Sequence, residues 1–285
     1  MNKRNRSEGW KHAKISGHKN ESQIETLLIN NKSYSDMFLK KIGKPNSKII
    51  NVSGGGPNEK NIDCIFSNEK TKSKVDVYVE LDDNERRNIS VKKSISGQVY
   101  LITIDRFING FEIQYNKKIP QTVKDSIMLF WGSHKDTLSI IKTYGTQPQY
   151  EKRKHRLVAD TLKKYKSSYY NNLIDWFKKN IYEITDFCFS RGLSKNPEDW
   201  ADLIWYKNEL GENSVNDIYT IGELCRACDI KCDEEVYYGT IGGGTTIQLP
   251  FGFVQWHSPR KTIPGCMQFH HNYEKISNTM KILNL

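Results

Sequence analysis

The sequence predicts an α/β protein in which a mixed central β-sheet is flanked by helices, with a C-terminal region of further helices and strands. Three observations favour this class. Short runs rich in β-branched and aromatic residues crowd residues 48–104. Apolar residues at three- and four-residue spacing lie before and after these runs, as expected of helices that cover a sheet. A second group of short strand-like runs lies in residues 201–271.

The first predicted elements are a basic arm and two helices. Residues 1–20 are basic, polar and unpatterned, so we expect a partly ordered arm. From residue 20 the apolar spacing indicates a helix. A second short helix over residues 34–42 ends at Gly43, because glycine commonly follows the end of a helix.

Five strands and then three helices are predicted next. The strands have the sequences KIINV, NIDCIF, SKVDVYVEL, NISVKKS and GQVYLITI. The helices have the sequences DRFINGFEIQY, QTVKDSIMLFWG and KDTLSIIKTYG. We expect these three helices to pack on the sheet that the preceding strands form.

The polar, charged segment 145–156 is the predicted boundary between two halves of the chain. The predicted parts are an arm over residues 1–20, a core over 21–145 and a helical and β region over 146–285. In the third part a helical region carries a wide apolar face between residues 173 and 187. Five short strands are expected within ADLIWYK, EEVYYGTI, TTIQL, FGFVQWH and GCMQFHH, followed by a short helix over residues 273–283.

The charge balance favours a polyanionic partner. The formal net charge is +10, and nucleic acid is the usual polyanion bound by a protein this basic. No run of about 18 apolar residues and no signal-peptide pattern occurs, so we expect no membrane partner. Six scattered cysteines indicate reduced thiols rather than a disulfide framework. We therefore expect a soluble cytoplasmic protein.

The hairpin over residues 72–94 carries the strongest candidate site. Because side chains alternate along a strand, Val77 and Val79 face the core while Asp76 lies on the other face. Ser90 and Lys92 share that face on the partner strand, so Asp76 and Lys92 can converge. An acid that binds Mg²⁺ and a lysine that orients water suit phosphodiester hydrolysis. The alternative is a solvent-facing sheet surface with a weak cross-strand ion pair.

The arrangement of Asp76, thirteen residues, then Ser90-Val91-Lys92 resembles the PD-(D/E)xK nuclease motif. The chain looks most like small type II restriction endonucleases, the group related to MspI and the GCGC-cutting enzymes. Further stretches that resemble this group are HKNESQIETLL, NVSGGGPNEKNIDCIF and FGFVQWHSPRKTIPGCMQFHH. The likeness covers roughly residues 10–131 and 235–271. It implies a restriction-endonuclease-like core and a glutamate, Glu21, that joins Asp76 at the metal.

This resemblance implies a Mg²⁺-dependent, sequence-specific endonuclease that cuts double-stranded DNA and leaves a 5′-phosphate. A DNA methyltransferase that protects host DNA would be its functional partner. Two alternatives stay open: a repair nuclease or nickase on the same fold, and a DNA-binding protein whose nuclease site has decayed. The sequence leaves the recognition site, the stagger of the cut and the oligomeric state open.

The motif departs from the family pattern at Ser90, where most members have an acid. A neutral hydroxyl leaves the metal with less negative charge, so another carboxylate must compensate, and Glu21, Glu80 and Asp63 are the candidates. We favour Glu21. Asp63 also competes with Asp76 as the first acid, and we favour Asp76 because a short turn links it to the lysine strand.

Residues that contact DNA are predicted both before and after the middle of the sequence. Amides and basic groups read base edges, and basic groups also contact phosphates. Gln98 is expected to enter a groove, and Lys93 and Arg106 to contact phosphates. By the resemblance, the C-terminal candidates for the major groove or backbone are Gln255, His257, Arg260, Lys261 and Gln268.

The cysteines of CRACDIKC are spaced as in some zinc sites, with Cys266, His270 or His271 as further ligands. Their helical periodicity instead places Cys225 and Cys228 on an apolar face. We therefore predict core packing rather than metal binding for this segment.

Overall fold

A computed structural model describes residues 22–54, 61–145, 156–208, 215–257 and 265–283. The chain forms two compact units, and both are discontinuous in sequence. Unit 1 combines residues 1–95 with 189–222, and unit 2 combines 96–188 with 223–285. The predicted boundary at 145–156 lies within unit 2, so the chain divides differently from the sequence-based expectation.

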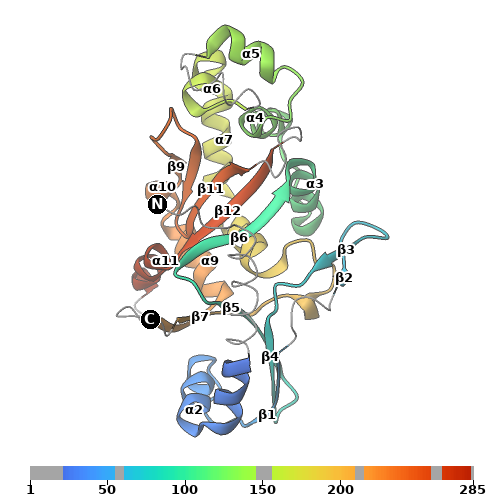
Figure 1. The fold of residues 1–285 in the computed structure, drawn as a ribbon, viewed down its shortest axis with the longest axis vertical. Coiled ribbons are helices and arrows are strands. Elements are labelled where there is room, and N and C mark those ends of the chain that lie inside the picture. The colour runs from blue at the N-terminus through green and yellow to red at the C-terminus, as the bar shows by residue number, and fades with distance from the viewer. Residues whose placement is uncertain (1–21, 55–60, 146–155, 209–214, 258–264, 284–285) are drawn as a thin grey trace, which may run out of the picture. The chain divides into compact units, whose positions relative to one another are not determined.

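Unit 1 contains a five-stranded mixed sheet (Figure 1). Its strands, in spatial order, are β1 (Ile49–Gly54), β4 (Val77–Leu81), β5 (Arg86–Lys92), β7 (Leu203–Asn208) and β8 (Val215–Thr220). β5 and β7 run parallel, and the other neighbouring pairs run antiparallel. With helices packed against this sheet, the predicted mixed α/β class is confirmed.

Two helices cover one face of this sheet. They are a helix over residues 22–30 and α2 (Lys32–Lys41), which begins where the Asn31 side chain accepts a hydrogen bond from the Tyr34 N–H. Ile24 of the first helix packs with the sheet residues that alternate inward. The buried members of this core from the strands are Val52, Val77, Val79, Leu81, Ile89, Leu203, Trp205 and Ile218.

The other face of β5 meets the segment that returns to unit 1. Asn88 is buried and donates hydrogen bonds of 2.8 Å to the carbonyls of Glu198 and Trp200. This segment contains the helical turns η2 (Phe187–Arg191) and η3 (Pro197–Asp199). A small hairpin of β2 (Asn61–Asp63) and β3 (Lys70–Lys72) joins the same segment through a bridge between Cys64 and Ser194.

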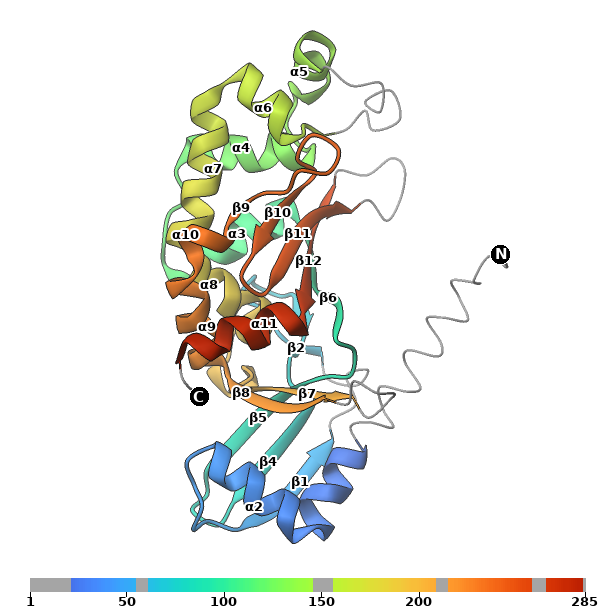
Figure 2. The ribbon, with the colours of Figure 1, turned by 90° about the vertical axis from the view of Figure 1, so that its left-hand side faces the viewer.

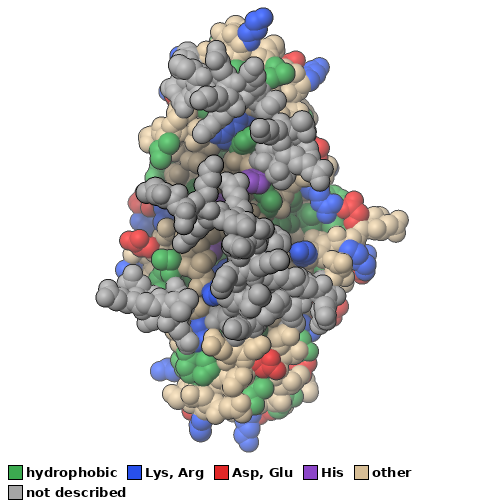
Figure 3. Space-filling view, viewed as in Figure 1, with side chains coloured by type: hydrophobic (Ala, Val, Ile, Leu, Met, Phe, Trp, Pro, Cys, Tyr) green, Lys and Arg blue, Asp and Glu red, His purple; other side chains and the backbone are tan. Residues whose placement is uncertain are grey.

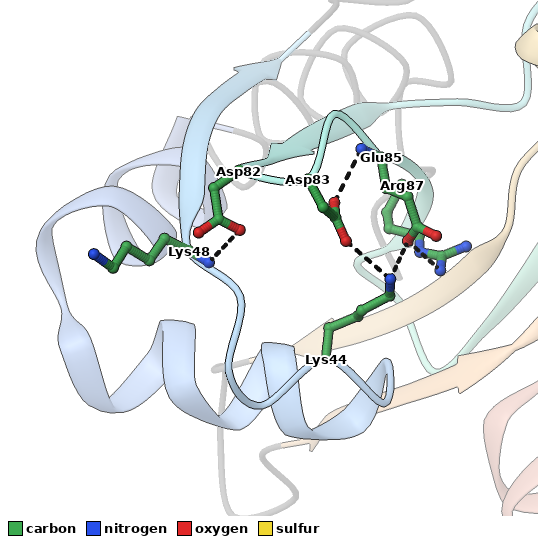
Figure 4. A network of polar contacts seen from close by, with 6 residues as sticks. All are labelled: Lys44, Lys48, Asp82, Asp83, Glu85 and Arg87. Carbon is green, nitrogen blue, oxygen red and sulfur yellow. Dashed lines mark hydrogen bonds and ion pairs between the residues drawn. The ribbon is translucent and has the colours of Figure 1, made fainter.

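A charged network fixes the turn between β4 and β5 (Figure 4). Lys44 lies 2.9 Å from Asp83 and 3.1 Å from Glu85, and Glu85 also pairs with Arg87. The backbone N–H of residue 48 donates to Asp82. The loop after α2 is thereby tied to the hairpin turn, which supports the register of β4 against β5.

Unit 2 contains a second five-stranded sheet, which is antiparallel throughout. Its strands, in spatial order, are β6 (Ser96–Thr103), β12 (Cys266–Asn272), β11 (Gly252–His257), β10 (Thr246–Leu249) and β9 (Tyr237–Tyr238). The predicted strand GQVYLITI therefore pairs with the C-terminal strands and not with the N-terminal sheet. The expectation that all five early strands form one sheet was wrong.

The helices of unit 2 follow the predicted spacing. They are α3 (Ile104–Tyr115), α4 (Gln121–Trp131), α5 (Thr137–Tyr144), α6 (Ala159–Tyr165), α7 (Ser167–Lys179), α8 (Ile181–Asp186), α9 (Ile221–Ile230, whose first two residues belong to unit 1), α10 (Cys232–Glu235), α11 (Tyr273–Met280) and the turn η4 (Lys281–Leu283). Three of them, α3 to α5, were expected to pack on the first sheet and instead belong to this unit.

One face of the second sheet packs against helices (Figure 2). Phe269 of β12 lies 5.8 Å, between ring centroids, from Phe107 of α3, which in turn contacts Trp176 of α7. Figure 2 shows α4, α7 and α8 on this same side. Within the described ranges, no helix combines the length and apolar character needed to cross a bilayer.

Candidate functional site

The candidate site lies where β4 and β5 separate at one end of the hairpin. Asp76 immediately precedes β4, and its backbone N–H donates to the Ile89 carbonyl at 2.9 Å. Its carboxylate oxygen Oδ2 accepts the Val91 N–H at 2.7 Å. A side-chain oxygen thus satisfies a strand N–H that a backbone carbonyl would otherwise satisfy, which anchors the carboxylate at this position.

Ser90 connects Asp76 to Lys92. The Lys92 Nζ donates to Ser90 Oγ at 2.7 Å, and Ser90 Oγ lies 3.5 Å from Asp76 Oδ2. Ser90 is 1% exposed, so its hydroxyl is a buried link between the two charged groups. The structure therefore brings the three motif residues together, and this face is not the solvated sheet surface of the alternative interpretation.

Burial shifts both charged groups of this trio toward their neutral forms. It raises the pKa of Asp76, an effect that the Lys92 charge and the Val91 N–H oppose. It lowers the pKa of Lys92, although the Asp76 charge opposes this shift. A lysine with a lowered pKa releases its proton more readily than an exposed lysine, as a group that exchanges protons with water must.

The oxygen atoms beside Asp76 suit a hard divalent cation. Asp76 Oδ2 takes both of the carboxylate contacts described above, and Ser90 supplies a neutral oxygen beside it. Mg²⁺ is usually held by one or two carboxylates and by waters and substrate oxygens, so this donor set fits part of such a site. Across the described part of the chain, no three His, Cys, Asp or Glu side chains gather closely enough to hold a metal.

The three carboxylates that were predicted to compensate for the neutral Ser90 lie in different parts of the chain. Glu21 lies outside the described residues. Glu80 accepts a hydrogen bond from Asn51 at 2.9 Å, on the strand pair β1 and β4. Asp63 is exposed on the β2–β3 hairpin and pairs with Lys70, which lowers the pKa of its carboxyl. Asp63 thus has a separate cationic partner, whereas Asp76 contacts the lysine strand directly.

Glu25 is a further carboxylate that the sequence analysis did not select. It lies on the helix over residues 22–30, and its Oε2 is 3.4 Å from where a Cβ on Gly54 would be. Gly54 pairs with Val77, the residue that follows Asp76. The signal for Glu25 was its spacing, because four residues would place it on the same face as Glu21 in the predicted helix.

The second polar face belongs to the sheet of unit 2. Gln255 of β11 donates from Nε2 to Gln268 Oε1 on β12 at 2.9 Å, and Gln268 Nε2 donates to Gln98 Oε1 on β6 at 2.7 Å. Gln255 Nε2 also lies 3.1 Å from His270 Nε2. We call these four residues the Gln–His row. Three of them were predicted to contact DNA, and His270 was considered there only as a metal ligand.

The other predicted DNA-contact residues do not join this row. His257 is at the end of β11, and its charge helps to lower the pKa of His270, although burial of His270 is the larger cause. Arg106 is on α3, on the helix side of the sheet. Lys93 follows β5 in unit 1. Arg260 and Lys261 lie outside the described residues.

The cysteines of α9 pack in the core, as predicted. Cys225 and Cys228 are buried, and burial raises the pKa of Cys228 to about 12. A thiol must lose its proton to bind zinc, so this environment disfavours a metal-bound thiolate.

Comparison with known proteins finds a likeness among solved structures. No protein-family model matches the chain. No curated protein matches it either. Among solved structures, it is similar to restriction endonuclease MspI in complex with its cognate DNA, with 14% identity and a TM-score of 0.47. The likeness covers 87% of this chain and 83% of that chain. A likeness with a TM-score below 0.5 does not by itself indicate a function.

Proposed function

We propose that this protein is a sequence-specific endonuclease of the type II restriction class that hydrolyses phosphodiester bonds in double-stranded DNA with Mg²⁺. The single observation that carries this proposal is the contact chain from Lys92 through Ser90 to Asp76. A half-buried carboxylate beside a half-buried lysine at the end of a hairpin matches what phosphodiester hydrolysis requires.

Each residue of the trio has a distinct proposed role. Asp76, with Ser90, would hold Mg²⁺, which when bound lowers the pKa of water and stabilises phosphate charge. Lys92 orients the attacking water, accepts or returns a proton at Nζ, and stabilises charge on the phosphate. Ser90 holds the lysine in place through its 2.7 Å contact. Glu25 of the first helix, or Glu21 as the sequence favours, would supply the second negative charge.

The net charge of +10 supports DNA as the substrate, because phosphate neutralisation supplies much of the affinity of a DNA-binding protein. Lys and Arg side chains are visible across the described surface in Figure 3. The neutral amides of the Gln–His row are suited to base edges rather than phosphates. A DNA methyltransferase is the proposed functional partner, and the cytoplasm the proposed compartment.

Two other functions compete with this proposal. A repair nuclease or nickase would use the same trio on a different DNA substrate. A DNA-binding protein without cleavage is favoured by one observation, which is the neutral Ser90 hydroxyl in place of a second carboxylate. These functions differ in what they do to plasmid DNA.

Incubation of supercoiled plasmid with purified protein and Mg²⁺ separates the three functions. Discrete linear fragments with defined ends are expected for the restriction nuclease. Open circles would indicate a nickase, and bound but intact plasmid would indicate a binding protein. Sequencing of the fragment ends would also give the recognition site and the stagger of the cut.

The variant Lys92→Ala tests the site itself. We expect cleavage to fall by roughly a thousandfold, because the variant removes a cation that stabilises the transition state, while specific binding is retained. Lys48→Ala is the matched control, since the Lys48 side chain points away from the network in Figure 4 and only its backbone makes the contact. Cleavage by Lys92→Ala at the rate of the control would rule out this site.

A further inference from the structure

The Gln–His row has a defined direction. Gln255 and Gln268 each donate from Nε2 to the next Oε1, so the three amides point the same way across three neighbouring strands. Each amide oxygen can accept two hydrogen bonds and each amide nitrogen can donate two. Reversing one amide would set two donors or two acceptors against each other, so the amides can turn only as a set.

His270 determines that direction. The Gln255 nitrogen that donates to Gln268 also faces His270 Nε2 at 3.1 Å. With the amides in this direction an N–H of Gln255 meets His270 Nε2, which requires a neutral ring with its proton on Nδ1, whereas a proton on Nε2 would require the Gln255 oxygen at that position. Burial and the neighbouring His257 lower the pKa of His270, which agrees with a neutral ring. Phe253 stacks on the ring at 4.6 Å between centroids and holds its plane.

A β-bulge brings Gln98 into the row. The β6–β12 register shifts between Phe269 and His270, so that Tyr100 pairs with Phe269 and Gln98 pairs with His270. Strict alternation would have placed Val99 opposite His270 and turned Gln98 to the helix side. The extra residue turns the Gln98 side chain to the face of Gln268.

The row leaves a specific pattern of hydrogen-bonding groups. Both Gln255 N–H groups are used, so Gln255 offers only its carbonyl oxygen. Gln268 uses one lone pair and one N–H, which leaves one acceptor and one donor side by side on the same amide. An amide with an adjacent acceptor and donor is the complement of the N6 and N7 edge of adenine.

We propose that the Gln–His row is a single base-reading unit in which His270 sets the amide direction and Gln268 reads adenine in an A·T pair of the recognition site. This inference rests on the proposed function for its DNA partner. His270 is a positioning residue in this account, because it acts through Gln255. Gln98 is exposed and Gln268 is half-buried, so these amides can meet a ligand.

The tautomer of His270 is the first test, and it requires no DNA. Long-range ¹H–¹⁵N correlation spectra of the labelled full chain at neutral pH are expected to show a protonated Nδ1 and an unprotonated Nε2. A ring protonated on Nε2 would overturn the proposal, because Gln255 would then have to present its oxygen and the whole row would reverse.

Selection of bound sequences is the second test. A library of duplexes is incubated with the protein in Ca²⁺, chosen to separate binding from cleavage, and the bound fraction is sequenced. We expect an A·T pair in the selected site, with roughly tenfold preference over G·C at that position. A site composed only of G·C pairs would overturn the proposal.

The variant His270→Phe keeps the stacking on Phe253 but removes the acceptor. We expect it to lose most of the A·T preference while its overall affinity changes less. Gln248→Ala is the matched control, because Gln248 lies on the same face and bonds to Thr246 instead of the row. An unchanged preference in His270→Phe, with the fold confirmed by circular dichroism, would overturn the proposal.

These outcomes distinguish the proposal of a base-reading row from the proposal of a nuclease. Selective A·T binding without cleavage would leave the row intact and refute the nuclease. Cleavage with the opposite His270 tautomer would leave the nuclease intact and refute the row. If His270→Phe does not fold, the His270 tautomer in the native chain still tests the proposal.

Discussion

The two polar faces of this protein use opposite kinds of chemistry. In unit 1 the β4–β5 hairpin holds two ionisable groups, Asp76 and Lys92, joined by a buried hydroxyl. In unit 2 one face of β6, β12 and β11 holds neutral amides and an imidazole in one hydrogen-bonded row. The first arrangement shifts pKa values, as a reacting site requires. The second fixes donors and acceptors, as recognition of a base edge requires.

The two faces also differ in how exposed their side chains are. Ser90 is 1% exposed, and low exposure strengthens the interaction between the charges that it joins. Gln98 is exposed and Gln268 is half-buried, so these amides can contact a ligand without the desolvation of a buried charge. Under the proposed function, unit 1 would supply the reaction and unit 2 the selectivity.

The largest expected effect comes from Asp76→Asn. Its remaining amide oxygen can still accept the Val91 N–H, so the fold is expected to persist, while the charge that attracts Mg²⁺ is lost. We expect cleavage to fall by roughly a hundredfold to a thousandfold, measured as the rate of plasmid linearisation against Mg²⁺ concentration. Full activity at ordinary Mg²⁺ would show that the charged face of unit 1 is structural.

The next effect separates Glu25 from Glu21. Glu25→Gln is expected to raise the Mg²⁺ concentration needed for half-maximal cleavage by about tenfold or more, because its carboxylate lies beside Gly54. Glu21→Gln, four residues earlier in the sequence, serves as the comparison. A larger shift for Glu21→Gln would return the second carboxylate to the residue that the sequence favoured.

A smaller effect, on selectivity rather than rate, is expected from Gln268→Ala. Loss of the central amide should reduce discrimination at one base pair by roughly tenfold. The measurement compares cleavage of duplexes that differ at that pair, with Gln248→Ala as control. An equal loss of rate on every duplex would instead indicate a general effect on the sheet of unit 2.

The smallest expected effect is on stability. Lys44→Met removes the exposed contacts with Asp83 and Glu85, and exposed ion pairs contribute little to folding. We expect a slight decrease in thermal midpoint that disappears at high salt, because salt screens these charges. A large decrease that is independent of salt would mean that this turn controls the position of Asp76.

The hairpin in unit 1 was predictable because residues that are close together in the sequence determine it. Alternation of side chains and a short turn were sufficient to place Asp76, Ser90 and Lys92 on one face. Only the burial of Ser90 was unexpected, since the returning segment that contacts β5 is far away in the sequence.

The arrangement in unit 2 could not be predicted in the same way. β6 follows β5 directly yet pairs with β12, and nothing in the β6 sequence specifies a partner so distant along the chain. The bulge that turns Gln98 toward Gln268 depends on that pairing. Gln255 and Gln268 were selected through a family resemblance, whereas their contact with His270 required the strand register.

The parallel pairing of β5 with β7 has a consequence for biosynthesis. The chain leaves unit 1 after residue 95 and returns at residue 189, so β7 emerges from the ribosome long after its partner β5. Until then the nascent sheet has an open edge at β5, the strand that carries Lys92. A DNA-cutting site built on that edge would be completed only after most of unit 2 has been translated.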